Sequence, residues 1–547
     1  MMDEANLSRR RLLGLGAAGA VSGGSRLILV RAAGPALARR KPSPIVTTDK
    51  GPVRGLWSPT EASIAWLGIP YAAPPVGDLR FAPPQPAKPW TEARASALGA
   101  PAIQNPSPSS VNPTSDLGRA LQQVFPVAAE VAAQSEDCLY LNVWAPAAPR
   151  SPRPVMVWFH GGGFAYGSGG WPMYDGTNLA EHQDVVVVTV NHRLNVFGYL
   201  DLPEVEGSGN AGMLDLLAAL EWVRDNIRQF GGDHCNVTIF GESGGGAKVS
   251  YLLAMRRAEG LFHRAIIQSG PGVKAVPRDR AAALRADLYK TLGLVEGDVK
   301  SLRAVPAERL QQACAAAEAR QPGAGFDRSG FSPVEDDAIL PVHPWDPAGP
   351  PSAWHVPVMI GVNKDEMTLF MASAPWFGKL DDAGLNAMAA GIYGPKAPQV
   401  LAALRKDFPA DSPTYLATHL VTYGRMFAGS VQIAERHAAQ GGAKTWFYVL
   451  EWETPVGPFR SPHTLEMPLV FDNVDSSRVL VGPGPEPQLM AKQMSKAWAT
   501  FAKYGDPNSG DLPSWPPYEA GKRSTMMFNT TCRVVDDPYA ATRKAVT

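Results

Sequence analysis

The chain contains 547 residues, of which 45% are hydrophobic and 19% are charged. This balance is typical of a globular protein with a large core and excludes a disordered chain. The 51 basic and 51 acidic residues cancel, so no basic excess points to nucleic acid as a partner. The four cysteines are far apart and form no CxxC pair, so we expect no zinc site and favour free thiols; they are Cys138, Cys235, Cys314 and Cys532.

Residues 1–38 are typical of an export signal. Ser8-Arg9-Arg10-Arg11-Leu12-Leu13 supplies a twin-arginine segment, a weakly apolar stretch follows, and Ala36-Leu37-Ala38 offers a small-x-small cleavage site. Arginines interrupt the apolar stretch, so no run of about 20 apolar residues is left to span a membrane. We therefore expect a twin-arginine-type signal peptide and an exported, periplasmic or secreted, domain of residues 39–547. The alternative is a flexible basic tail.

Strand-like and helix-like segments follow one another from residue 45 onward. Residues 45–81 alternate short apolar runs with Gly and Pro, which predicts β-hairpins, and residues 105–116 have the composition of a surface loop. Residues 155–159 form a continuous apolar run, as expected of a strand buried on both faces. Residues 212–230 carry apolar side chains at helical spacing. Further strands are predicted at 185–190, 237–240, 265–267, 356–362 and 446–450, and a last helix at about 487–504.

Buried strands that alternate with helices predict an α/β fold with a mostly parallel sheet and helices on both faces. Two stretches, 272–350 and 370–440, do not fit this alternation. They contain helical runs such as residues 281–292. We expect them to be helical insertions over the C-terminal edge of the sheet, where they would help to wall a pocket.

Gly241-Glu242-Ser243-Gly244-Gly245 matches the pattern G-x-S-x-G between a predicted strand and a predicted helix. In that context, a sharp turn pushes the serine hydroxyl out of the sheet toward a helix N-terminus. Glycine flanks the serine because a side chain would clash in so tight a turn. The same stretch nearly matches a phosphate-binding loop, but Ala247 stands where lysine must follow the glycine, which argues against nucleotide binding. Ser243 is therefore the candidate nucleophile.

His160-Gly161-Gly162-Gly163 follows the predicted strand 155–159. Consecutive glycines at the end of a buried strand let backbone N–H groups approach a ligand closely. Acyl transfer needs such donors in a fixed position to bind the oxyanion that develops on the carbonyl oxygen. We expect the N–H groups of Gly162, Gly163 and Gly244 to form this oxyanion hole.

A serine nucleophile needs a histidine base and an acid that orients it, in the chain order Ser, acid, His. Of the histidines that follow the acid candidates, His419 and His437 lie in helix-like stretches. His463 lies in a loop after a predicted strand, which is the expected setting. Asp365 and Glu366 both follow the strand 356–362, and their chemistry alone does not separate them.

These motifs together resemble the type-B carboxylesterase family, which includes the cholinesterases and has the α/β-hydrolase fold. Two segments look like family signatures, Glu136-Asp137-Cys138-Leu139-Tyr140-Leu141-Asn142-Val143 and Phe240-Gly241-Glu242-Ser243-Gly244-Gly245-Gly246. Three shorter segments also match, Asn191-His192-Arg193-Leu194, Gly209-Asn210-Ala211-Gly212 and Phe230-Gly231-Gly232-Asp233. The resemblance covers nearly all of residues 39–547.

The resemblance assigns roles that the residues alone leave open. Gly361-Val362-Asn363-Lys364-Asp365-Glu366 is similar to the family segment whose final glutamate is catalytic, which favours Glu366 over Asp365. His463 matches the family histidine, and Glu242 matches a carboxylate that supports the site. Gly244 stands where alanine is usual, a difference that is expected to loosen the pocket. No cysteine precedes Cys138, so the usual family disulfide is absent.

The resemblance implies a serine carboxylesterase that hydrolyses small-molecule esters through an acyl-enzyme on Ser243, with no metal or organic cofactor. One alternative keeps the same triad and cleaves an amide, a carbamate or a lactone. A second is a non-catalytic binding relative; such proteins characteristically lose members of the triad, whereas Ser243, Glu366 and His463 are all present. The sequence names neither the natural substrate nor the oligomeric state.

Overall fold

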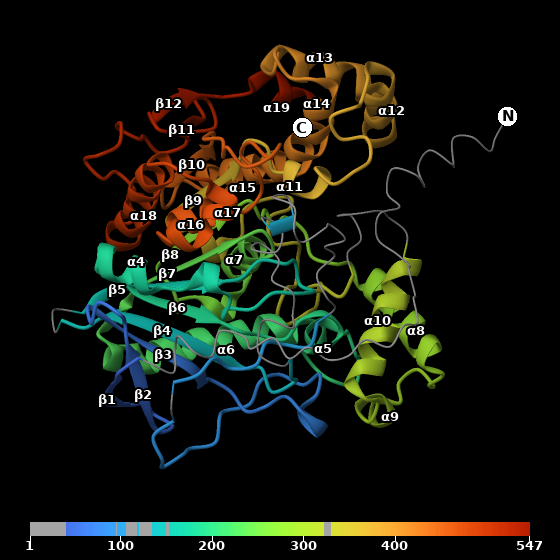
Figure 1. Ribbon diagram of the computed structural model, residues 1–547. Helices are drawn as coiled ribbons and strands as arrows, with labels where there is room; N and C mark the ends of the chain where they lie inside the picture. Colours follow the sequence, from blue (N-terminus) through green and yellow to red (C-terminus); the bar gives the residue numbers. More distant parts are fainter. Residues whose placement is uncertain (1–39, 95, 105–117, 120–133, 149–151, 322–329) are drawn as a thin grey trace.

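A computed structural model describes residues 40–547 except residue 95 and the ranges 105–117, 120–133, 149–151 and 322–329. Its centre is one sheet of twelve strands in the order β1-β2-β3-β4-β6-β5-β7-β8-β9-β10-β11-β12 (Figure 1). The strands are β1 (Pro42–Thr47), β2 (Pro52–Trp57), β3 (Ser63–Pro70), β4 (Tyr140–Pro146), β5 (Arg153–Phe159), β6 (Val186–Val190), β7 (Gly232–Glu242), β8 (Arg264–Gln268), β9 (Val358–Asn363), β10 (Thr445–Leu450), β11 (Ser524–Phe528) and β12 (Arg533–Asp536).

In the order of the sheet, the seven strands β6-β5-β7-β8-β9-β10-β11 are parallel to one another, and the strands at the two margins pair antiparallel. The parallel strands are buried on both faces, which explains their unbroken apolar runs. In β5, the side chains of Val155, Val157 and Phe159 join one hydrophobic cluster, while Met156 and Trp158 join another on the opposite face. The predicted mostly parallel sheet is confirmed.

Sixteen α-helices lie in the described part of the chain, and they cover both faces of the sheet. Helices α6, α7 and α15 contribute to the cluster on one face, and α4, α16 and α18 to the cluster on the other. The helices are α4 (Thr177–Gln183), α5 (Asn195–Tyr199), α6 (Ala211–Asn226), α7 (Gly244–Ala254), α8 (Arg278–Leu292), α9 (Val299–Arg303), α10 (Ala307–Arg320), α11 (Thr368–Met371), α12 (Asp382–Tyr393), α13 (Ala397–Asp407), α14 (Pro413–Val421), α15 (Ala428–Ala439), α16 (Glu466–Val470), α17 (Arg478–Val481), α18 (Glu486–Tyr504) and α19 (Ala540–Val546).

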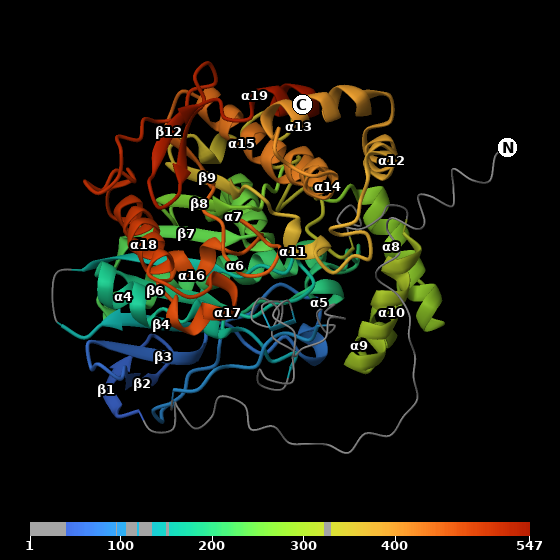
Figure 2. The same cartoon turned by 45° about the horizontal axis from the view of Figure 1, so that its top comes forward.

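The two stretches that broke the alternation in the sequence are helical, but only part of them stands apart from the sheet. Helices α8 to α10 and α12 to α14 lie in the right-hand part of the molecule in Figures 1 and 2. Helix α15 instead packs on β9 and β10. The end of the stretch 370–440 therefore belongs to a layer that covers the sheet, because Val431 and Ile433 bury an apolar face there.

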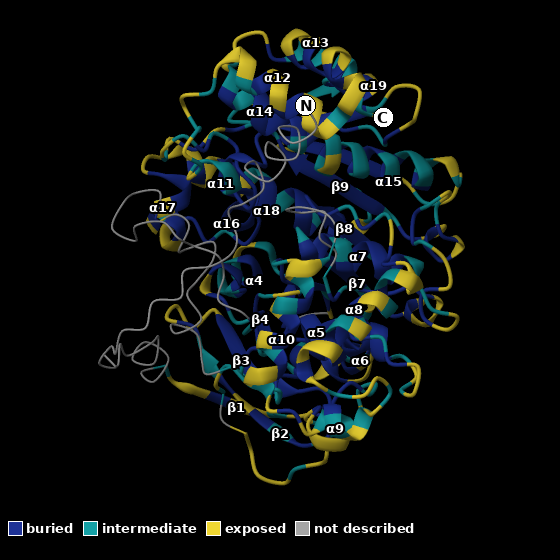
Figure 3. Ribbon diagram, turned by 90° about the vertical axis from the view of Figure 1, so that its right-hand side faces the viewer, coloured by how far each residue is buried: buried dark blue, intermediate teal, exposed yellow. Residues whose placement is uncertain are grey.

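Figure 3 shows the central strands of the sheet buried, whereas the marginal strand β1 is largely exposed, and other exposed residues lie on the outer sides of the helices and in the loops. No helix in the described residues is long and apolar enough to cross a membrane. The predicted export signal, residues 1–38, and the predicted surface loop at 105–116 lie outside the described residues. All four cysteines are described and free; Cys138, Cys314 and Cys532 are buried and Cys235 is exposed.

Candidate active site

Ser243 occupies a sharp turn between β7 and α7. Its φ of 56° and ψ of −122° lie in a region that non-glycine residues rarely adopt, at a cost of about 1–3 kcal/mol. The neighbouring sheet holds this strained backbone in place, since the Ser243 N–H donates to the Gln268 carbonyl at 2.8 Å. A side chain at Gly241 or Gly245 would overlap backbone atoms of this turn or of β5. Ser243 is partly exposed between buried neighbours, as a nucleophile must be to reach a substrate.

The three glycines after β5 lie directly over this turn. A side chain at Gly161 would contact Glu242 and Ser243, and one at Gly244 would overlap the backbone of Gly163. Gly162 and Gly163 have φ values of 85° and 61°, which only glycine adopts at little cost. The Gly162 carbonyl accepts hydrogen bonds from the N–H groups that follow at 165 and 166.

Three N–H groups at this junction have no acceptor in the described part of the chain. They belong to Gly162, Gly163 and Gly244, the residues that the sequence predicted as the oxyanion hole. Gly244 is buried, Gly162 is half-buried and Gly163 is exposed, so a substrate can reach these donors from the open side. Unpaired donors beside a strained serine are therefore available to a developing oxyanion. The expectation that Gly244 loosens the pocket stays a prediction; in the structure, backbone atoms of Gly163 occupy the space that a methyl group at position 244 would need.

His463 and Glu366 meet in a buried hydrogen bond. The Nδ1–H of His463 donates to Oε2 of Glu366 at 2.6 Å, and the His463 N–H donates to the Glu366 carbonyl at 3.2 Å. The other oxygen, Oε1, accepts from the Asn363 N–H at 2.7 Å. Both side chains are almost completely buried. The carboxylate therefore holds the imidazole ring through Nδ1, and the other ring nitrogen, Nε2, takes no part in this hydrogen bond.

The alternatives that the sequence left open lie elsewhere. Asp365 is buried beside Arg460 and His419, each 3.8 Å from its Oδ1. His419 hydrogen-bonds Asp411 at 2.8 Å, and His437 bonds the Thr445 hydroxyl at 2.7 Å. The structure therefore brings Glu366, and not Asp365, to His463.

Glu242 approaches the opposite edge of the ring. Its Oε1 lies 3.1 Å from Nε2 of His463, but the two atoms are not aligned for a hydrogen bond. Ser243 Oγ also makes no side-chain hydrogen bond to the described residues, and catalytic hydrogen bonds are often long before substrate binds. Burial lowers the pKa of His463, but the negative charges of Glu242 and Glu366 outweigh it and raise that pKa to about 9. Burial raises the pKa of Glu242 well above its usual value, against the opposing effect of the charge on His463, so the charges of these two groups depend on each other.

A further buried carboxylate, Glu466, completes the charged cluster. Its oxygens accept from the side chains of Asn363 at 2.6 Å and Gln268 at 3.3 Å. Burial, followed by the charge of Glu366, raises its pKa to about 7. The sequence analysis assigned no role to Glu466. Its position three residues after His463 in the chain, opening a helix of buried residues, was the available signal.

Comparison with known proteins identifies the family to which this arrangement belongs. A model of the carboxylesterase family matches residues 42–546. The chain belongs to the carboxylesterase family. It is 36% identical over 507 residues to para-nitrobenzyl esterase of Bacillus subtilis (strain 168), across 91% of this chain and 98% of the relative. It is 34% identical over 514 residues to the liver carboxylesterase of Sus scrofa, across 87% and 88%.

Solved structures extend this agreement to the fold. A para-nitrobenzyl esterase superposes with a TM-score of 0.79 at 34% identity, covering 92% of this chain and 99% of that one. A carboxylesterase from Geobacillus stearothermophilus gives 0.77 at 37% identity, covering 92% and 100%. The present carboxylesterase has the predicted α/β-hydrolase fold, and it is a serine hydrolase that acts on carboxylic esters.

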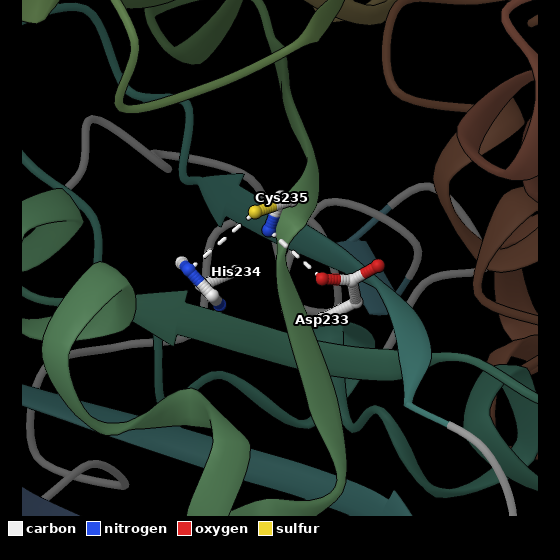
Figure 4. Close-up of side chains that lie close together, drawn as sticks. All are labelled: Asp233, His234 and Cys235. Atoms are coloured by element: carbon white, nitrogen blue, oxygen red, sulfur yellow. Dashed lines mark hydrogen bonds between the residues drawn. The ribbon is translucent and has the colours of Figure 1, made fainter.

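One group of potential metal ligands occurs in the described residues of this carboxylesterase, and it lies at the amino end of β7. Figure 4 shows Asp233, His234 and Cys235, whose ligand atoms lie within 4.8 Å of one another. Local hydrogen bonds account for this arrangement. The Cys235 N–H donates to Oδ1 of Asp233 at 3.0 Å, and the Cys235 sulfur lies 3.4 Å from Nε2 of His234. Ser243 follows the opposite end of the same strand.

Proposed function

We propose that Ser243, His463 and Glu366 form the catalytic triad of this esterase. The observation that carries the proposal is the buried 2.6 Å hydrogen bond from His463 to Glu366, in a site where Ser243 is held in a strained turn under three unpaired N–H groups. A carboxylate bound to Nδ1 selects the tautomer whose Nε2 accepts a proton. The residue order Ser, Glu, His is the order of this fold.

Ester cleavage proceeds in two steps at this site. Nε2 of His463 takes the proton of Ser243 as the oxygen attacks the ester carbonyl, and Glu366 stabilises the imidazolium that forms. The N–H groups of Gly162, Gly163 and Gly244 bind the oxyanion. His463 then protonates the leaving alcohol, and water releases the acid by the reverse path. Glu242 supports the site through the charge that it places beside His463.

Replacement of the serine tests this proposal. Ser243→Ala should abolish turnover of a p-nitrophenyl ester and covalent labelling by an organophosphate, because the attacking oxygen is gone. Mass spectrometry of the labelled wild-type protein should place the phosphoryl group on the peptide that contains Ser243. Ser250→Ala, a buried serine on the same helix, is the matched control and should keep both. Labelling at another residue, with activity retained in Ser243→Ala, would overturn the assignment.

The bond preference within this reaction class is a separate question. An amide, a carbamate or a lactone passes through the same oxyanion, so the triad alone does not favour the ester. Ester hydrolysis follows from the family, whose related members are named as esterases, and what is left to measure is how strongly esters are preferred over the other bonds. Turnover of an ester and an amide with the same acyl group and matched leaving group measures the preference. Esters graded by acyl length and alcohol size, beginning with p-nitrobenzyl esters because of the bacterial relative's name, would map the substrate class.

We also propose that the enzyme is exported. The support is the twin-arginine segment Ser8–Leu13, the apolar stretch after it and the cleavage pattern at 36–38. A twin-arginine signal implies that the esterase folds before transport. N-terminal sequencing of protein recovered outside the cytoplasm should begin near Arg39. An intact Met1 in that pool would contradict the proposal, and an Arg9→Lys/Arg10→Lys double variant should remain inside the cell.

A further inference from the structure

Lys248 is a fully buried lysine one turn into helix α7, on the helix that begins at the proposed nucleophile. Lysine is almost never buried completely unless its amine has partners. Here the Nζ group donates to the Gly163 carbonyl at 2.7 Å and to the His160 carbonyl at 3.1 Å. It also lies 4.9 Å from the centre of the Phe164 ring. All of these partners belong to the loop that follows β5.

In the chain, the carbonyls of His160 and Gly163 stand on either side of the peptide groups that supply two donors of the proposed oxyanion hole. The His160 carbonyl belongs to the peptide unit before Gly161, and the Gly163 carbonyl to the unit after Gly163. The peptide N–H groups of Gly162 and Gly163 lie between these two fixed points. A glycine run has more conformational freedom than any other sequence, so its donors keep one orientation only if the surroundings impose it. Lys248 imposes it at both ends of the run.

Gly244 makes this arrangement possible. A side chain at position 244 would overlap the backbone of Gly163, so the loop reaches its present position only because that side chain is absent. In that position the Gly163 carbonyl comes within hydrogen-bond distance of Lys248. The two residues act on the same peptide, one by leaving space for it and the other by binding it.

The surroundings explain why the lysine is not a charge partner of an acid. The rings of His160 and His192 stack 4.7 Å apart, and burial keeps the pKa of each low, at about 3 for His160. Burial also lowers the pKa of Lys248 to about 7, against the opposing effect of Glu242. No carboxylate in the described residues forms an ion pair with Lys248. Its partners are carbonyl oxygens, as expected of a group whose role is positional.

We propose that Lys248 is a positioning residue that holds the oxyanion-hole loop against Ser243 by binding the carbonyls of His160 and Gly163. This inference rests on the proposed function, because it assumes that the N–H groups of Gly162 and Gly163 bind the oxyanion. It assigns no contact between Lys248 and substrate. Its effect is confined to the orientation of donors that are used in the transition state.

Lys248→Met tests the proposal, since methionine has a similar length and no donor. We expect kcat for a p-nitrophenyl ester, per site titrated with an organophosphate, to fall about 10- to 100-fold with little change in KM, less than the loss of an oxyanion donor itself (~10²–10³). Affinity for a trifluoromethyl ketone, whose adduct places an oxyanion in the hole, should fall by the same factor. Affinity for a non-hydrolysable ether of the same shape should not change. Titrating active sites removes any misfolded fraction from the comparison.

Ser250→Ala is the matched control, because Ser250 on the same helix bonds the Gly246 carbonyl at 2.9 Å and does not touch the loop. It should change stability and leave kcat per titrated site unchanged. Gly244→Ala supplies a second test, since its methyl group should displace Gly163 from Lys248. The double variant Gly244→Ala/Lys248→Met should then lose less activity than the product of the two single losses.

Two results would overturn the inference. One is a Lys248→Met enzyme with wild-type kcat per site and unchanged affinity for the trifluoromethyl ketone. The other is a double variant whose loss equals the product of the single losses, which would mean that the two residues act independently. Either result leaves the proposed function intact as long as Ser243→Ala is inactive. Turnover by Ser243→Ala would instead contradict the proposed function itself.

Discussion

Strand β7 carries Asp233, His234 and Cys235 at its amino end, and at its carboxyl end Glu242 leads into Ser243. Both ends bring reactive side chains close together. At the amino end the group is partly exposed, and its hydrogen bonds link residues that adjoin in the chain. At the carboxyl end, elements far apart in the chain converge on buried charges and a strained turn. Burial and long-range convergence, more than proximity, distinguish a site from a cluster.

Removal of the acid should have the largest effect at the carboxyl end. Glu366→Gln keeps the shape of the side chain but can stabilise neither the tautomer nor the imidazolium of His463, so we expect kcat to fall about 10⁴-fold. Single-turnover acylation by a p-nitrophenyl ester measures this. Asp365→Asn is the matched control, because that carboxylate is equally buried but faces Arg460 and His419. Equal losses in the two variants would mean that burial, and not contact with His463, decides the role.

The charge beside the base should affect the pH profile. Three carboxylates raise the pKa of His463, and the charge of Glu242 has a larger effect than the charges of Glu366 and Glu466. His463 acts as a base only when neutral, so a raised pKa moves the acidic limb of kcat/KM toward alkaline pH. Glu242→Gln removes that charge and should move the limb to lower pH. Glu453→Gln, an exposed carboxylate paired with Lys364, should leave it in place, and a limb that moves upward in Glu242→Gln would contradict the electrostatic account.

The buried lysine should appear in the pH dependence of stability. Burial lowers the pKa of Lys248 from 10.5 to about 7 in the folded state. Below pH 7 the amine is charged in both the folded and the unfolded state, so the fold bears the full cost of burying that charge. That cost disappears as pH rises from about 7 to 10.5. The groups that face the amine are His160, His192 and Glu242. The Tm of Lys248→Met minus that of wild type should therefore fall as pH increases through this window. A difference that is constant with pH would show that the amine is not perturbed.

The smallest effect should come from the amino end of β7. Cys235→Ser changes an exposed side chain with local bonds, for which a change within about 0.5 kcal/mol, or about twofold, is expected in kcat/KM. Added Zn²⁺ should change the activity of wild type and Cys235→Ser equally. A zinc effect that disappears with Cys235 would break the contrast between the two ends of the strand.

The parts that sequence predicted well are those with a local signal. Residues 155–159 and 237–240 lie in β5 and β7 because strands buried on both faces need unbroken apolar runs. Ser243 was recognised because the sharp turn restricts its neighbours to glycine. The pairing of Glu366 with His463 was not local, since 97 residues separate them. In the sequence, only the resemblance distinguished Glu366 from Asp365. In the structure, the backbone at the end of β9 distinguishes them, because its last N–H group, that of Asn363, binds Glu366.

Lys248 was missed for a physical reason as well. In a helix of ordinary amphipathicity a lysine marks the solvent side, but α7 lies beneath the loop after β5 and is buried almost throughout. Three glycines precede Ala247 and Lys248 in the sequence and leave room for that loop. Which side chain then meets which carbonyl depends on how helix α7 packs against the loop after β5, which the order of residues does not reveal. The same limit applies to α15, which the sequence grouped with the insertions.

The exposure of Cys235 makes the enzyme suitable for oriented immobilisation. It is the one exposed thiol among the four cysteines, all of which lie in described residues. Eight residues of extended chain, about 25 Å, separate it from Ser243. A maleimide surface that couples Cys235 would therefore hold every molecule by the same edge, with its proposed catalytic face turned toward the solution.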